Sequence, residues 1–146
     1  MTTRKPSSLS RTEPLDTMDA LVQLSFRIQR VLSETGAKHD VSIIQIRLLG
    51  VLRDRQAGMV ELGRHLGLDK SSMTGLVSRA EKRGFVKRVA STDDGRAVVV
   101  SLTPAGKKLT DRCTAQIGDR ISELTEALTP NQRAQITKLA TKLVWA

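Results

Sequence analysis

Aromatic residues are scarce in this chain of 146 residues: they make up 2% of it, and tyrosine does not occur. The three aromatic side chains are Phe26, Phe85 and Trp145. Proteins that bind single-stranded nucleic acid stack the bases on aromatic side chains. A nucleic-acid-binding surface on this chain would therefore suit duplex DNA better than RNA or single strands.

Cysteine and catalytic motifs are equally rare. Cys113 is the one cysteine, which excludes an intrachain disulfide and a multi-cysteine metal cluster. His39 and His65 are too far apart in the sequence to form the spacing of a zinc site. The chain also has no P-loop, no GxSxG and no GxGxxG motif. We expect no enzyme activity, no cofactor and no metal.

Long apolar runs are missing as well. No run approaches the roughly 20 apolar residues of a membrane helix, and the start MTTRKPSSLSRTEPLD lacks the apolar segment of a secretory signal. We expect a cytoplasmic protein with no membrane partner. Residues 1–12, rich in Ser, Thr, Arg and Lys, are expected to form a flexible arm.

Positive charge, in contrast, is abundant. The sequence has 24 Lys and Arg against 15 Asp and Glu, a net charge of +9. A charge of this sign and size favours a polyanionic partner through Coulomb attraction and counterion release. Many basic proteins merely have a well-solvated surface, so charge alone does not identify the partner.

Apolar residues recur at helical spacing in the first part of the chain. A first helix is predicted over about residues 16–35, with Gly36 ending it. A second helix is predicted over residues 42–52, starting with the capping-box spacing of Ser42 and Gln45. It is apolar on nearly every side, so we expect it at the centre of the fold.

Two further helices are predicted near the C-terminal end of the sequence. Thr103 and Thr129 each precede a proline, which is the pattern of an N-cap followed by proline at the first helical position. Both helices carry an apolar stripe, and the stripe of the last helix is expected to face inward.

Residues 59–78 carry the pattern of a helix-turn-helix motif. Leu62 and Leu66 lie one turn apart on a first short helix, and Gly67 can supply the positive φ of a tight turn. Asp69 is placed to cap the second helix. The residues expected to pack this second helix on the first are Met73, Leu76 and Val77.

The outward face of that second helix is polar and small. Short hydroxyl side chains let a helix approach bases and phosphates in the major groove, and Lys70 and Arg79 add charged donors. The alternative, a solvated helix face, usually carries longer Glu and Lys side chains in i,i+4 pairs. The predicted DNA contacts of this helix are Lys70, Ser71, Ser72, Thr74, Gly75, Ser78 and Arg79.

A β-hairpin is predicted next, over residues 85–102. Two β-branched runs flank STDDG, in which Asp and Gly suit a turn. Arg88 on the first strand and Arg96 at the tip are predicted to reach a flanking phosphate or the minor groove, with Asp94 bracing Arg96. The alternative is an exposed hairpin with scattered basic side chains.

Three stretches occur in an order typical of one family: VSIIQIRLLGVL, ELGRHLGLDKSSMTGLVSRAEKRGFVKR and DGRAVVVSLTPAG, covering most of residues 41–106. The chain resembles the MarR family of winged-helix regulators. Asp94 and Arg96 fall on the Asp-x-Arg pattern of the family's wing. Two positions depart from the family pattern, since Gly63 replaces the usual alanine and Gly95 a commoner basic residue.

The resemblance implies a homodimer whose first and last two helices intertwine on a pseudo-palindromic operator. The expected fold is mainly α: a winged helix-turn-helix DNA-binding domain with a two-stranded β wing (39–103) and dimerisation helices (13–38 and 104–146). These helices carry more apolar surface than a small winged domain covers; an intramolecular helical hairpin is the alternative. The predicted interface residues are Leu24, Ile121, Leu124, Leu128, Ile136, Leu139 and Leu143.

The resemblance also implies regulation by a small ligand or by oxidation. Arg27 lies among apolar residues of the first helix, Arg47 interrupts the second, and His39 lies between them. These cations suit a small anionic aromatic effector, unless each arginine extends to water or pairs with a local acid. Cys113 lies in an apolar stripe that favours a buried, inert thiol, although nearby Lys and Arg side chains leave a redox sensor open.

The predicted function is that of a sequence-specific DNA-binding transcriptional regulator, a repressor whose homodimer is released from double-stranded DNA by a small molecule. Two alternatives remain at this point. One is a nucleic-acid scaffold protein without sequence specificity, and the other is a thiol-based redox-sensing regulator that acts through Cys113.

Overall fold

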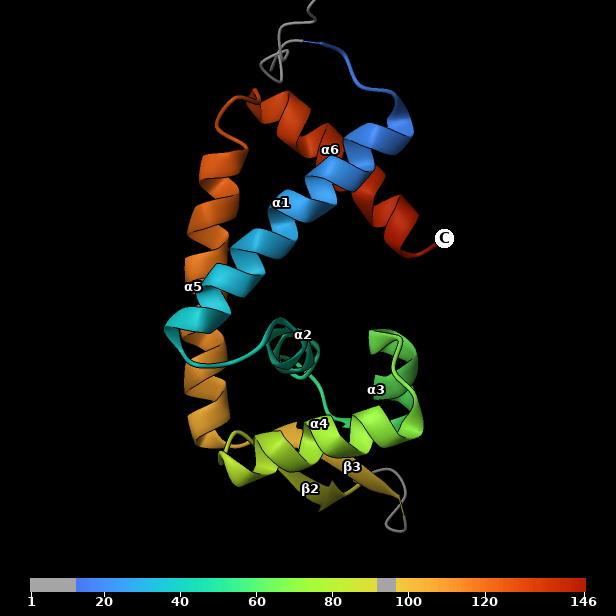
Figure 1. The fold of residues 1–146 in the computed structure, drawn as a ribbon, viewed down its shortest axis with the longest axis vertical. Helices are drawn as coiled ribbons and strands as arrows, with labels where there is room; N and C mark the ends of the chain where they lie inside the picture. The colour runs from blue at the N-terminus through green and yellow to red at the C-terminus, as the bar shows by residue number, and fades with distance from the viewer. Residues whose placement is uncertain (1–12, 92–96) are drawn as a thin grey trace, which may run out of the picture.

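The computed structural model describes residues 13–91 and 97–146, so the arm predicted over residues 1–12 lies outside the described residues. Within this part of the chain, α1 and α6 form an upper region, and α2, α3, α4 and a small sheet form a lower one (Figure 1). The helix α5 extends through both regions. The bounds are α1 Thr17–Lys38, α2 Ile43–Val51, β1 Ala57–Gly58, α3 Met59–Leu66, α4 Lys70–Lys82, β2 Val86–Ala90, β3 Val98–Leu102, α5 Pro104–Leu124 and α6 Pro130–Val144.

The helix α1 continues past the glycine that was predicted to end it. Gly36 is buried within the helix, which extends to Lys38. A Cβ on Gly36 would lie 2.5 Å from the carbonyl oxygen of Val41, so glycine here allows the following chain to fold back against the helix. The reversal itself occurs at Asp40, whose φ is 56°. The predicted end was wrong because Gly36 serves a close backbone approach and does not terminate the helix.

The helix α2 lies at the centre of the lower region, as its apolar surface predicts. Its capping box is confirmed: the Gln45 N–H donates to the Ser42 hydroxyl at 3.2 Å, and the Ser42 N–H donates to the Gln45 amide oxygen at 3.1 Å. Leu48 and Leu49 are buried in a core shared with α3, α4 and the sheet. This core holds the helix-turn-helix motif together.

The sheet is antiparallel and has the strand order β1-β3-β2. The predicted two-stranded hairpin is confirmed as β2 and β3, which pair from Val86 opposite Leu102 to Ala90 opposite Val98. The sequence did not predict β1, because two residues are too few to show strand alternation. Through Ala57, which is opposite Val100, β1 joins the chain before α3 to the base of the hairpin.

The helix α5 starts in close contact with the base of the hairpin. Thr103 caps it by accepting from the Gly106 N–H at 3.0 Å, with Pro104 at the first helical position as predicted. The Thr103 hydroxyl donates to the carbonyl of Gly84. A Cβ on Gly106 would lie 1.8 Å from the Phe85 carbonyl oxygen, so only glycine permits this packing of α5 against the chain entering β2.

The last helix, α6, has no buried residue within the chain. Its predicted inward side chains Ile136, Leu139 and Leu143 are instead exposed at 39%, 60% and 62% of their surface. The prediction of an inward stripe was therefore wrong for a single chain. Because α5 ends at Leu124, Leu128 lies in the connection to α6. The other predicted interface residues, which are half-buried like Leu128, are Leu24, Ile121 and Leu124.

None of the helices in the described ranges is long and apolar enough to cross a membrane.

Candidate nucleic-acid interface

The turn between α3 and α4 has the geometry that its glycines predict. Gly67 adopts the left-handed conformation (φ 69°, ψ 33°), and the Leu68 N–H donates to the Gly63 carbonyl at 2.9 Å. A Cβ on Gly63 would lie 3.0 Å from the Leu68 carbonyl oxygen and 3.2 Å from Cγ of Met73. Glycine at position 63, where alanine was expected, therefore allows α3, the turn and α4 to pack closely.

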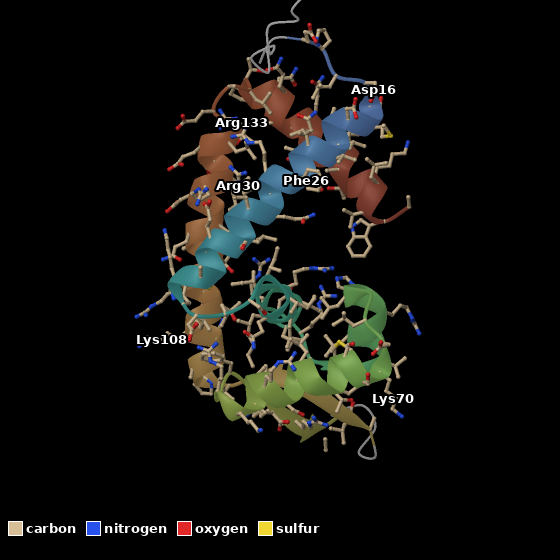
Figure 2. All side chains as sticks on the ribbon, viewed as in Figure 1. Asp16, Phe26, Arg30, Lys70, Lys108 and Arg133 are labelled. Atoms are coloured by element: carbon tan, nitrogen blue, oxygen red, sulfur yellow. The ribbon has the colours of Figure 1, made fainter. Side chains whose placement is uncertain are left out.

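The helix α4 presents one apolar face and one polar face. The apolar residues Met73, Leu76 and Val77 are buried against the rest of the motif, as predicted, and so is Ala80. On the other face, Lys70 lies at the N-terminal end of the helix (Figure 2). The residues predicted to contact DNA divide into exposed Lys70, Ser71, Ser72, Thr74 and Arg79 and half-buried Gly75 and Ser78.

Hydrogen bonds hold the hydroxyl groups at the start of α4 in place. The Asp69 carboxylate accepts from the Ser72 N–H at 2.7 Å and from the Ser71 hydroxyl at 3.2 Å. These bonds, the backbone N–H of Ser72 first, lower the pKa of Asp69 below its ordinary value of 3.8. The Thr74 hydroxyl donates to the Lys70 carbonyl at 2.9 Å. The hydroxyl oxygens of Ser71 and Thr74 therefore have fixed positions on the exposed face.

Gly75 makes room for the side chain of Arg79. A Cβ on Gly75 would lie 3.1 Å from Nη1 of Arg79, so the guanidinium lies back along the helix over the glycine. Because Gly75 has no side chain, the middle of this face of α4 is free of bulk and the guanidinium of Arg79 occupies it.

The hairpin is joined to α4 by an ion pair. Arg88 of β2 donates from Nε to a carboxylate oxygen of Glu81 at 3.0 Å. Arg88 was predicted to contact DNA; in the described structure its guanidinium braces the hairpin against α4. Asp94, Gly95 and Arg96, on which the rest of the wing prediction rests, lie outside the described residues.

A second arginine, Arg83, connects α4 to the loop between α1 and α2. Its guanidinium donates to the carbonyl oxygens of Asp40 and, at 3.4 Å, of His39. It also lies over the ring of Phe85, 4.9 Å from the ring centroid. The sequence did not predict this link, because residues 40 and 83 are brought together by the fold alone.

The comparisons with known proteins agree with this geometry. The model of the MarR family matches residues 39–97. Over 117 residues the chain is 30% identical to the multiple antibiotic resistance protein MarR of Escherichia coli strain K12, covering 79% of this chain and 81% of that protein. The chain belongs to the MarR family.

Solved structures extend this likeness to the three-dimensional fold of the MarR family. A variant of E. coli MarR in complex with operator DNA has a TM-score of 0.69 and 28% identity, covering 86% of this chain and 92% of that chain. NadR in complex with 4-hydroxyphenylacetate has a TM-score of 0.74 and 21% identity, covering 98% and 97%, a likeness of fold alone. The protein is thus a MarR-family winged-helix transcriptional regulator.

The three residues predicted to bind an effector in this MarR-family protein do not come together. The ring Nε2 of His39 lies 2.9 Å from the amide oxygen of Gln116 in α5. Arg27 is exposed and lines a cleft between α1 and α5, whereas Arg47 lines a different cleft beside α6. Because α1 continues to Lys38, Arg27 lies three turns, or about 16 Å, before the junction where it was expected. In the described chain Arg27 and Arg47 thus line different clefts, and a role of the three residues in binding an effector stays a prediction.

Cys113 has the environment of an inert thiol. It is 4% exposed and lies in a small core with Val41 and Ile46. Burial raises the pKa of the Cys113 thiol, which lowers the fraction of reactive thiolate at neutral pH. These observations favour the inert thiol over the redox sensor.

Proposed function

We propose that the protein acts as a homodimer that places α4 of each subunit in the major groove of a pseudo-palindromic operator, represses transcription there, and is released by a small aromatic anion. One observation carries the DNA-binding part: the buried face of α4 fixes the helix on the motif, and the opposite face exposes short hydroxyls between two cations. Lys70 and Arg79 are these cations. This combination suits close approach to bases and phosphates.

The proposed dimer is supported by exposed apolar surface in the upper region. Phe26 of α1 and Leu139 of α6 are exposed at 61% and 60%. Surface of this kind on a single chain indicates a protein interface. Two copies related by a two-fold axis would read half-sites about 34 Å apart on one face of the duplex.

Two observations support the proposed release by an effector. NadR, which shares the fold, was crystallised with 4-hydroxyphenylacetate, a small aromatic carboxylate. The cationic clefts beside α5 and α6 suit a ligand of the same class. That the protein represses transcription, as the sequence analysis predicted, remains part of the proposal.

Competition binding tests sequence specificity. Genomic fragments are selected on the purified protein, and the best fragment is then challenged with unrelated duplex at physiological salt. We expect the selected fragment to survive a large excess of competitor, because base contacts add to the phosphate contacts. Equal competition by both duplexes would instead favour the scaffold protein.

Substitution of Arg79 tests the contact face. Arg79→Ala should weaken operator binding by about 10- to 100-fold, because a charged donor contributes about 1.5–3 kcal/mol where it is used. Lys138→Ala on α6 removes the same charge far from the motif and is the matched control. If both variants bind the operator like the wild type, α4 does not use Arg79 on DNA.

A further inference from the structure

A hollow of about 450 Å³ opens beside the first turns of α4, between this helix, α3 and β2. Much of its lining is apolar: the half-buried or buried side chains of Met59, Leu68 and Met73 face it, together with Val60, which is exposed at 77%. Lys70, labelled in Figure 2, also lines it. We name it the α3–α4 hollow. Its apolar lining differs from the hydroxyls and cations on the rest of the exposed face of α4.

Thr74 belongs both to the polar face of α4 and to the lining of the α3–α4 hollow. Its side chain is exposed, and its hydroxyl donates to the Lys70 carbonyl at 2.9 Å. The single proton of this hydroxyl is therefore used within the helix, so the oxygen is left only as an acceptor. The methyl group of Thr74 remains available for an apolar contact with a partner.

Positive charge around the hollow favours a polyanion as its occupant. Arg64 of α3 and Lys70 line the hollow, and neither pairs with an acidic side chain within the ranges that the structure describes. Arg88 lines it too, with its Nε bonded to Glu81. The carboxylate of Asp69, which is also part of the lining, accepts bonds from the start of α4. The cations suit phosphate oxygens, and the apolar lining between them suits an uncharged group.

The major groove of DNA carries one apolar group that fits this description. It is the C5 methyl group of thymine, which the other three bases lack, and the methyl group of a threonine is one of its usual protein contacts. The hollow is also continuous with the exposed hydroxyls of α4, through which the protein is proposed to meet DNA. Thymine is therefore the occupant that agrees with both the lining and the charge.

We propose that α4 recognises a thymine in each half-site of the operator by its C5 methyl group, which packs against the methyl group of Thr74 and the side chains of Met59 and Val60. Arg64 and Lys70 bind phosphates of the neighbouring backbone. The inference rests on the proposed function, in which α4 enters the major groove. It adds the identity of one base and assigns the discrimination to a methyl group and not to a hydrogen bond.

Replacement of thymine by uracil in the selected genomic fragment tests this contact. Uracil pairs with adenine as thymine does and differs from it only by lacking the methyl group. One position in each half-site should be sensitive: uracil should weaken binding about fourfold in one half-site and about 15-fold in both, the effect of burying one methyl group at each. Thymines outside the half-sites are the control and should be replaceable without loss of affinity.

Two variants of Thr74 separate its methyl group from its hydroxyl. Thr74→Ser keeps the hydroxyl and removes the methyl group, so it should bind the thymine and uracil fragments equally. Thr74→Val keeps the methyl group and removes the hydroxyl, so the preference for thymine should persist. Because Thr74 is exposed, neither change disturbs the core, and unchanged affinity for unrelated duplex checks the fold. Loss of the preference in Thr74→Val alone overturns the proposal, and so does the same response of both variants.

The same measurements distinguish this proposal from the proposed function. A fragment that is preferred over unrelated duplex, yet binds equally with thymine or uracil at every position, retains the regulator and overturns the thymine contact. If Val60→Ser then also changes the oligomeric state, the hollow is covered by a second copy of the chain. A protein with no preferred fragment contradicts the proposed function and this contact together.

Discussion

Asp69 combines two roles at the residue scale, since it caps α4 and orders the hydroxyl of Ser71. Its pKa lies below 3.8 in the folded chain, so its carboxylate stabilises the fold at pH values above 3.8. This contribution is lost as the pH falls through the folded pKa. We expect the free energy of unfolding of Asp69→Asn to depend less on pH in this acidic range than that of the wild type.

Denaturant unfolding at neutral pH and below pH 3.8 measures this difference. Asparagine still caps a helix but does not titrate, whereas Asp69→Ala loses the cap at every pH. An acid dependence that is the same in Asp69→Asn and in the wild type would show that Asp69 does not contribute to it.

Cys113 is expected to resist modification for as long as the chain is folded. Its burial and raised pKa leave little thiolate to react. Iodoacetamide should therefore label Cys113 slowly in buffer and quickly in denaturant, as read by mass spectrometry. Fast labelling of the folded protein, together with loss of operator binding, would instead support a redox-sensing regulator that acts through Cys113.

At the scale of elements, Arg83 connects the C-terminal end of α4 to the α1–α2 loop by bonds to two backbone carbonyls. Arg83→Ala should lower the free energy of unfolding by about 1 kcal/mol and weaken operator binding, because α4 loses a support at its C-terminal end. Lys82→Ala, a change at the exposed neighbour, is the control. Hydrogen exchange of the loop amides measures the local effect, and unchanged exchange would mean that Arg83 does not hold the loop.

The elements that the sequence predicted well are those with local signals. The caps at Ser42, Thr103 and Thr129 and the turn at Gly67 depend on residues within a few positions of one another, and all are confirmed. The polar face of α4 followed from helical spacing in the same way. In contrast, Gly36 was misread, because its function depends on Val41 folding back against it.

Contacts between distant elements decide which of the predicted effector residues lie near one another. Arg27 and Arg47 both stood out as cations among apolar residues, but the sequence could not show that they line different clefts. Trp145 was visible as the one tryptophan, yet its position opposite Arg47 depends on the path of α6 across the molecule. Only the arrangement of α2, α3 and α6 brings these side chains together.

For the whole molecule, the exposed stripe of α6 is expected to decide the oligomeric state. Replacing both Leu139 and Leu143 by glutamate should produce a monomer with a sharply reduced affinity for a palindromic operator, because a dimer no longer forms. Lys138→Glu introduces a negative charge on the same helix and should leave the dimer intact. Sedimentation equilibrium distinguishes the two, and a double variant that remains dimeric would place the interface elsewhere.

The glycines at the two ends of the winged motif limit how the sequence can vary. Gly36 and Gly106 approach the backbones of Val41 and Phe85 so closely that any side chain would collide with them, whereas a Cβ on Gly118 meets nothing within 4 Å. In a library selected for operator binding, positions 36 and 106 should therefore retain glycine. Gly118→Ala should be enriched, with about 0.5–1 kcal/mol of added stability from its place within α5. The residues that such a selection tolerates would thus identify the positions at which two segments of the backbone pack too closely for a side chain.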